Sequence, residues 1–124
     1  MKTVIHTDGA PAAIGPYSQG IRAGNLIVTS GQLPIDAVAG AMPDEIEAQT
    51  RQSLENCQSI LAAAGAGMEN GIKTTVFLKS MEDFAAMNSV YKAFFPEDYP
   101  ARSAVEVARL PKDALVEIEC IAVL

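Results

Sequence analysis

The sequence contains few of the residues on which common enzyme machinery depends. It has one histidine, His6, two cysteines and no tryptophan. No Ser-His-acid triad or Cys-His pair can be assembled convincingly around one histidine, and there is no cluster of metal ligands. A glycine-rich phosphate loop is also lacking. We therefore expect no bound metal and no catalytic site built on those motifs.

Basic residues and long apolar runs are also scarce. Nine lysines and arginines are scattered along the chain, and its net charge is −6. Surfaces that bind nucleic acid need clustered basic residues to neutralise phosphates, so nucleic acid is not an expected partner. No apolar run is long enough for a membrane-spanning helix, and residues 1–13 do not have the sustained apolar core of a signal peptide. We expect no membrane partner.

The two cysteines each fall within an apolar stripe: Cys57 lies at helical spacing from Leu54 and Leu61, and Cys120 lies in the last predicted strand. Unpaired cysteines in such stripes behave as small buried apolar side chains, and free thiols persist in reducing compartments. We expect both to be buried thiols of a cytoplasmic protein.

Length and composition favour one globular domain over residues 1–124. Apolar residues make up 49% of the chain and charged residues 19%. Periodicity and turn residues predict an order of elements: strands 2–6, 18–23 and 26–30, a helix from an N-cap at Asp44 to Gly65, strand 72–79, a helix from Ser80 to Pro96, and strands 102–107 and 115–124. This order predicts an α+β fold with a single mixed β-sheet and two helices packed on one face.

The last predicted strand, residues 115–124, carries apolar side chains on both faces. One face is wholly apolar and contains Val116, Ile118, Cys120, Ala122 and Leu124. The other face places two carboxylates, Glu117 and Glu119, among Leu115, Ile121 and Val123. A strand face that met only water would rarely carry those three aliphatic side chains. With both helices on the first face, we expect another copy of the chain to cover the second.

Strand 102–107 begins with an arginine. Burying Arg102 on an otherwise apolar strand is costly unless an anion meets the guanidinium. Two interpretations are open: a structural ion pair with a glutamate, or a site for a ligand carboxylate, which a guanidinium can bind bidentately. A turn at 110–113 separates this strand from the last one, and the spacing does not decide between the two interpretations.

Three other places offer polar groups to a ligand. Tyr17 follows a stiff Gly-Pro dipeptide that suits a lid, although its ring could equally pack on the surface. Ser30 and Gly31 end an apolar strand and would leave room and donors for a ligand, but a β-bulge or tight turn explains the same residues. Asn88 lies beside the apolar stripe of the second helix, where a ligand or the backbone must satisfy its amide.

Several motifs together resemble the RidA (YjgF) family. They are APAAIGPY at 10–17, TSGQ at 29–32, KTTVF at 73–77, PARS at 100–103, VEVARLPKD at 105–113 and VEIE at 116–119. The resemblance therefore runs nearly from end to end of the chain. It implies a chorismate-mutase-like fold and a homotrimer with three ligand clefts between subunits.

The resemblance also implies roles for single residues. Arg102 would grip the substrate carboxylate, and Glu117 would position or activate the attacking water. Four further residues would line the cleft: Tyr17, Ser30, Gly31 and Asn88. Many relatives carry a cysteine where this chain has Ala104, so the pocket here would be slightly larger and would lack a thiol at that position.

Members of the RidA subgroup hydrolyse enamine and imine intermediates of amino-acid metabolism. The resemblance thus implies a 2-iminobutanoate/2-iminopropanoate deaminase, which releases 2-keto acids and ammonia without a metal or organic cofactor. The same cleft could instead serve a non-catalytic regulatory module that binds a 2-keto acid. A ribonuclease, an activity attached to some relatives, is disfavoured by the acidic charge balance and the lack of a basic stripe.

Overall fold

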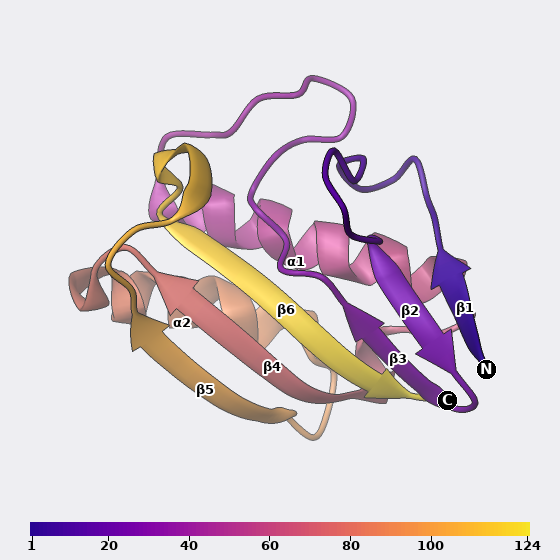
Figure 1. The fold of residues 1–124 in the computed structure, drawn as a ribbon. Helices are drawn as coiled ribbons and strands as arrows, with labels where there is room; N and C mark the ends of the chain where they lie inside the picture. The colour runs from indigo at the N-terminus through magenta and orange to yellow at the C-terminus, as the bar shows by residue number, and fades with distance from the viewer.

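One six-stranded sheet runs through the molecule, and two α-helices lie against one of its faces (Figure 1). The computed structural model describes residues 1–124. The strands are β1 (Lys2–Ile5), β2 (Gly20–Ala23), β3 (Leu26–Thr29), β4 (Gly71–Leu78), β5 (Ala101–Glu106) and β6 (Val116–Val123). The helices are α1 (Ile46–Ala63) and α2 (Phe84–Tyr91). The predicted α+β fold with a single mixed sheet is therefore confirmed.

The strand order is β1-β2-β3-β6-β4-β5, so the last strand lies in the interior of the sheet (Figure 1). β6 is antiparallel to both of its neighbours, β3 and β4, whereas β5 is parallel to β4. The sequence correctly placed a turn before β6, and a short 3₁₀ turn occupies Pro111–Asp113. However, β5 and β6 do not pair with each other, because β4 lies between them.

The first helix begins later than predicted. Its N-cap is Glu45, and no side chain caps it, so the expected capping by Asp44 is wrong. A tertiary contact fixes this end instead: the Gln49 amide donates to the Pro43 carbonyl at 2.8 Å and accepts the Leu115 N–H at 2.8 Å. The predicted end is confirmed, since Gly65 takes a left-handed conformation (φ +84) just beyond the helix.

The second helix is shorter than its sequence pattern predicts. The Ser80 hydroxyl accepts the Glu82 N–H, but this cap starts a 3₁₀ turn at Met81–Asp83, and α2 follows only at Phe84. The helical spacing predicts an inward stripe of Phe84, Met87, Tyr91 and Phe94 or Phe95. Met87, Tyr91 and Phe95 are buried, and Phe84 is partly buried.

The two faces of the sheet are covered unequally. On the helix face Ile27, Val76 and Ile118 are completely buried. On the opposite face no other part of the chain covers the strands, and Leu26 and Val105 are each 44% exposed. The predicted alternation of β6 is confirmed within the strand, where every second residue from Val116 to Ala122 is buried; Leu124 lies beyond it and is exposed.

Both cysteines are free and buried, as predicted. Neither helix of the chain is long and apolar enough to cross a bilayer.

Candidate functional site

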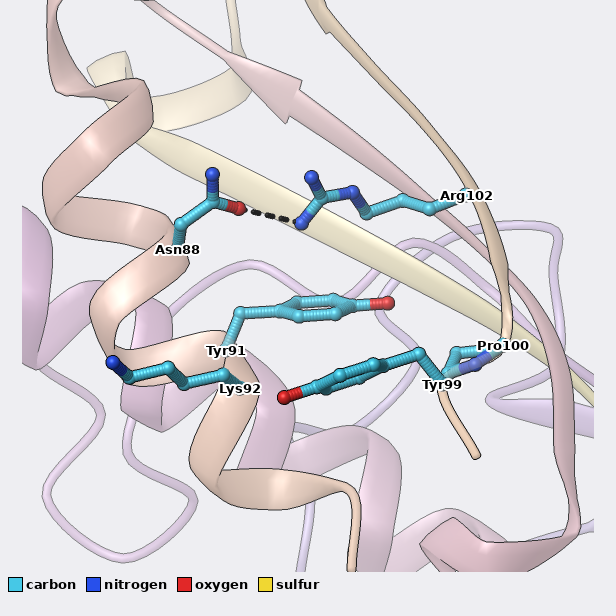
Figure 2. Close-up of a pocket in the computed structure, with 6 residues that line it drawn as sticks. All are labelled: Asn88, Tyr91, Lys92, Tyr99, Pro100 and Arg102. Atoms are coloured by element: carbon cyan, nitrogen blue, oxygen red, sulfur yellow. Dashed lines mark hydrogen bonds between the residues drawn. The ribbon is translucent and has the colours of Figure 1, made fainter. Parts of the chain in front are cut away.

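Arg102 lies on β5, the edge strand beside β4. It pairs with Thr74 of β4, whose buried hydroxyl is hydrogen-bonded to the Tyr91 hydroxyl of α2. Paired residues of neighbouring strands point to the same face of a sheet. The Arg102 side chain therefore lies on the helix face, where Figure 2 shows it beside α2.

The guanidinium of Arg102 is held by an amide and two aromatic rings. Its Nη1 donates to Asn88 Oδ1 at 2.6 Å (Figure 2). Its Cζ lies 4.8 Å from the centroid of the Tyr91 ring and 5.4 Å from that of Phe84. No carboxylate is among these contacts, and the single ion pair of the chain lies elsewhere. The interpretation of Arg102 as half of a structural Arg–Glu pair is therefore wrong.

A hollow of about 490 Å³ opens beside these groups. It is lined by Asn88, Tyr91, Lys92, Tyr99, Pro100 and Arg102 (Figure 2). Two of the lining side chains are cations and none is a carboxylate, so the hollow attracts anions. A guanidinium with unused N–H groups at its wall can bind a carboxylate through two parallel hydrogen bonds.

A β-bulge shapes the second group of candidate residues. Val28 of β3 pairs with Ile121 of β6, and the next bridge joins Gln32 to Ile118. Between these two bridges the β3 side therefore contains one more residue than the β6 side, which defines a bulge. The bulge that the sequence offered as one explanation of Ser30-Gly31 is thus confirmed. Because Gln32 points to the helix face with Ile118, its neighbour Gly31 faces the other way.

Gly31 lies directly against Glu117 on the uncovered face. A Cβ atom at Gly31 would overlap the Glu117 carboxylate and lie 2.9 Å from its Cδ. Only glycine therefore leaves this carboxylate in place. Burial raises the pKa of Glu117, and the negative charge of nearby Glu119 raises it further. A carboxylate of raised pKa can accept and return protons more readily near neutral pH.

Tyr17 and Ser30 lie near the same bulge. Tyr17 is 49% exposed; it lines one cavity with Ser30 and a second one with Gly31. The Ser30 hydroxyl donates to the Ser18 carbonyl at 2.6 Å, so its proton is engaged while its lone pairs remain available. We call Tyr17, Ser30, Gly31 and Glu117 the Glu117 cluster, and Asn88, Tyr91 and Arg102 the Arg102 cluster.

The two clusters lie on opposite faces of the sheet. Arg102 shares the face of Thr74, whereas Glu117 pairs with Phe77, three residues further along β4 and therefore on the other face. Within one chain the guanidinium and the carboxylate do not share a crevice. Ala104 lies two residues from Arg102 on the helix face and packs, partly buried, against the core.

The sequence did not single out three residues beside Arg102: Tyr91, Lys92 and Tyr99. Tyr91 was assigned to the apolar stripe of its helix. Its position three residues after Asn88 places both on one helix face, which is the signal that could have linked them. Tyr99 precedes Pro100 and so favours extended backbone, but nothing in its spacing indicates a neighbouring hollow.

Residues 7–124 match the model of the family described as endoribonuclease L-PSP. The matched residues include both the Arg102 cluster and the Glu117 cluster. The chain belongs to this family, which is the RidA/YjgF family.

Two kinds of relative are informative. The chain is 54% identical over 126 residues to proteins from Salmonella typhimurium and Escherichia coli that are named 2-iminobutanoate/2-iminopropanoate deaminase. These alignments cover 99% of this chain and 98% of each relative. The solved structure of the E. coli YjgF gene product superposes with a TM-score of 0.96 at 52% identity, over 98% of each chain. That of E. coli TdcF with bound serine superposes with a TM-score of 0.96 at 48% identity, again over 98% of each chain.

Proposed function

We propose that the chain is a 2-iminobutanoate/2-iminopropanoate deaminase, which hydrolyses reactive enamine and imine intermediates of amino-acid metabolism to 2-keto acids and ammonia. The near full-length identity of 54% to deaminases of that name supports this assignment. The observation that carries it in the chain itself is Arg102, a guanidinium fixed by Asn88 in a hollow without carboxylates.

The complete site forms between copies of the chain in a homotrimer. Arg102 and Glu117 occupy opposite faces of one sheet, so a second copy is needed to bring an Arg102 cluster against a Glu117 cluster. Two features of the chain favour such an arrangement. Arg102 lies on the edge strand, where a neighbour can reach it, and the Glu117 face carries uncovered aliphatic residues that association would bury.

The chemistry follows from the two charged groups. Arg102 binds the carboxylate of the 2-imino acid and so orients the adjacent C=N carbon. A water molecule attacks this carbon, Glu117 takes a proton from the water, and a C–O bond forms as the C=N double bond becomes single. Glu117 then returns this proton to the nitrogen, which gives a carbinolamine. It next takes the hydroxyl proton and passes it to the amino group, so that the C–N bond breaks, ammonia leaves and the C=O bond of the keto acid forms. Proton transfer of this kind accelerates a reaction by about 10²–10⁴-fold.

The remaining candidate residues shape the cleft in this proposal. Tyr17, Ser30, Gly31 and Asn88 line it, and Ala104 leaves space beside the clamp. Imines already hydrolyse in water, so the reaction requires no metal or organic cofactor. Nucleic acid has no role in it, and the buried free thiols suit a cytoplasmic location.

The experiment is a coupled assay in which an amino-acid oxidase or dehydratase makes the imine in place and keto-acid release is followed. We expect the unchanged chain to accelerate release and Arg102→Ala to abolish the acceleration, because the substrate carboxylate loses its partner. Glu117→Gln should slow turnover more than it weakens binding of pyruvate. Arg109→Ala is the matched control, since Arg109 is an exposed arginine paired only with Asp113.

Full acceleration by Arg102→Ala would contradict the assignment. A chain that binds pyruvate or 2-ketobutyrate but leaves imine hydrolysis unchanged would be a keto-acid-binding regulatory module instead.

A further inference from the structure

Tyr91 connects the core of the molecule to Arg102. Its side chain is buried, with 4% of its surface exposed, and its hydroxyl is hydrogen-bonded at 2.5 Å to that of Thr74, which is 1% exposed. The Phe95 ring packs against it with centroids 4.8 Å apart. The Tyr91 ring is thus fixed at its hydroxyl end by a hydrogen bond and on its flank by aromatic packing.

This fixed ring lies beneath the guanidinium of Arg102. The Cζ–centroid distance of 4.8 Å is within the range of a cation–π contact. The amide of Asn88 accepts from one guanidinium nitrogen, and no other hydrogen bond to Arg102 forms within the chain. Of the five N–H donors of an arginine, four therefore remain for a ligand. Figure 2 shows Tyr91 and Asn88 approaching the guanidinium from different sides.

We propose that Tyr91 is a positioning residue, which holds the guanidinium of Arg102 in the orientation that binds the ligand carboxylate. The inference rests on one part of the proposed function, the binding of a ligand carboxylate by Arg102, and not on imine hydrolysis. The physical reason is pre-organisation. An unsupported arginine loses much rotamer freedom when it binds, and a side chain already held in place loses less. The ring fixes the plane of the guanidinium, and the amide fixes its rotation within that plane.

The test measures pyruvate binding by calorimetry with the purified full-length chain. Tyr91→Leu keeps an apolar side chain but removes the ring, and the loss of a partly buried cation–π contact should weaken binding roughly tenfold. Tyr91→Phe keeps the ring and should bind within about threefold of the unchanged chain. Phe95→Leu is the matched control, because it removes a buried aromatic ring that touches Tyr91 but not Arg102.

A double-mutant cycle separates positioning from a general structural effect. If Tyr91 acts through Arg102, Tyr91→Leu has no further effect on pyruvate affinity once Arg102→Ala is present. Urea unfolding of each variant confirms that the folded chain is being measured. Equal losses of affinity with Tyr91→Leu and Phe95→Leu, or a tenfold loss that persists in the Arg102→Ala background, would overturn the proposal.

The two proposals fail in different ways. If the unchanged chain binds pyruvate with the expected coupling but does not accelerate imine hydrolysis, the deaminase assignment fails and the role of Tyr91 stands. If hydrolysis is accelerated but Tyr91→Leu binds pyruvate as well as the unchanged chain, the role of Tyr91 fails alone. Absence of pyruvate binding by the unchanged chain overturns the role of Tyr91.

Discussion

The same strands give the sheet two different faces. On the helix face, Val76 and Ile118 are fully buried against the helices. On the other face, Glu117 and Glu119 stand among aliphatic residues such as Ile121, and all three are only partly covered. The first face is completed by the chain itself. The second face combines exposed apolar area with two carboxylates. This combination suits contact with a partner and a polar ligand.

We expect the largest effect from a substitution on the helix face, which the chain itself covers. Ile118→Ala removes a side chain with no exposed surface and leaves a cavity beneath α1. We expect it to lower the free energy of unfolding by about 2–5 kcal/mol, measured by urea denaturation.

Ile121→Ala makes the same change three residues away, on the uncovered face. We expect it to weaken self-association, followed by sedimentation across a dilution series, more than it weakens the fold of the chain. If Ile121→Ala associates as strongly as the unchanged chain, the uncovered face is not the contact between copies.

Gly31→Ala should disturb the uncovered face without disturbing the core. The added Cβ overlaps the Glu117 carboxylate, which must move. Misplacing a catalytic group by about 1 Å can lower a rate on the order of 10²-fold. We therefore expect a loss of imine hydrolysis of roughly that size, with thermal unfolding little changed.

Gly15→Ala serves as the control for Gly31→Ala. Its Cβ would meet only the Tyr17 ring, at 3.4 Å, which is an ordinary contact. If the two glycine variants have the same activity, the close approach of Gly31 to Glu117 has no part in catalysis.

The smallest expected effect is a shift along the pH axis. The pKa of Glu117 is raised, first by burial and then by the charge of Glu119. A general base works only when deprotonated, so the acidic limb of the profile of kcat/KM against pH should lie above the ordinary range of glutamate. Glu119→Gln removes one of the two causes, and this limb should move to lower pH.

The raised pKa of Glu117 also predicts a pH dependence of stability. Activity should rise as Glu117 loses its proton, whereas stability should fall. Because folding raises the pKa of Glu117, the folded chain holds its proton more tightly than the unfolded one. The corresponding stability is present below the unfolded pKa and is lost as pH rises through the higher folded pKa. Glu117→Gln should abolish this component in urea unfolding between acidic and neutral pH. An identical pH dependence in that variant would contradict the raised pKa.

Most of the fold could be predicted from short-range patterns. The period-two alternation of Val116 to Ala122 and the helical spacing of Leu54, Cys57 and Leu61 identified the buried faces. What the patterns could not give was the pairing of β6 with β3 and β4. Strand order depends on contacts between residues far apart in sequence, and a turn at 110–113 looks the same whether its strands pair or not.

The sequence offered candidate residues for the site but not their geometry. The residue types of Arg102 and Glu117 suggest the roles proposed for them, whereas the faces on which they lie depend on the register of β4 against both neighbours. Tyr91 was overlooked because a tyrosine in an apolar stripe is satisfied by packing alone, and only its contacts link it to Arg102.

The central position of β6 has a consequence for folding. β6 joins β1–β3 to β4 and β5, because it pairs with β3 on one side and with β4 on the other. Until β6 is in place, the chain consists of two β-structures with exposed edges and nothing to unite them, a state vulnerable to aggregation. A deletion of β6 would therefore split the domain into two parts rather than trim its margin.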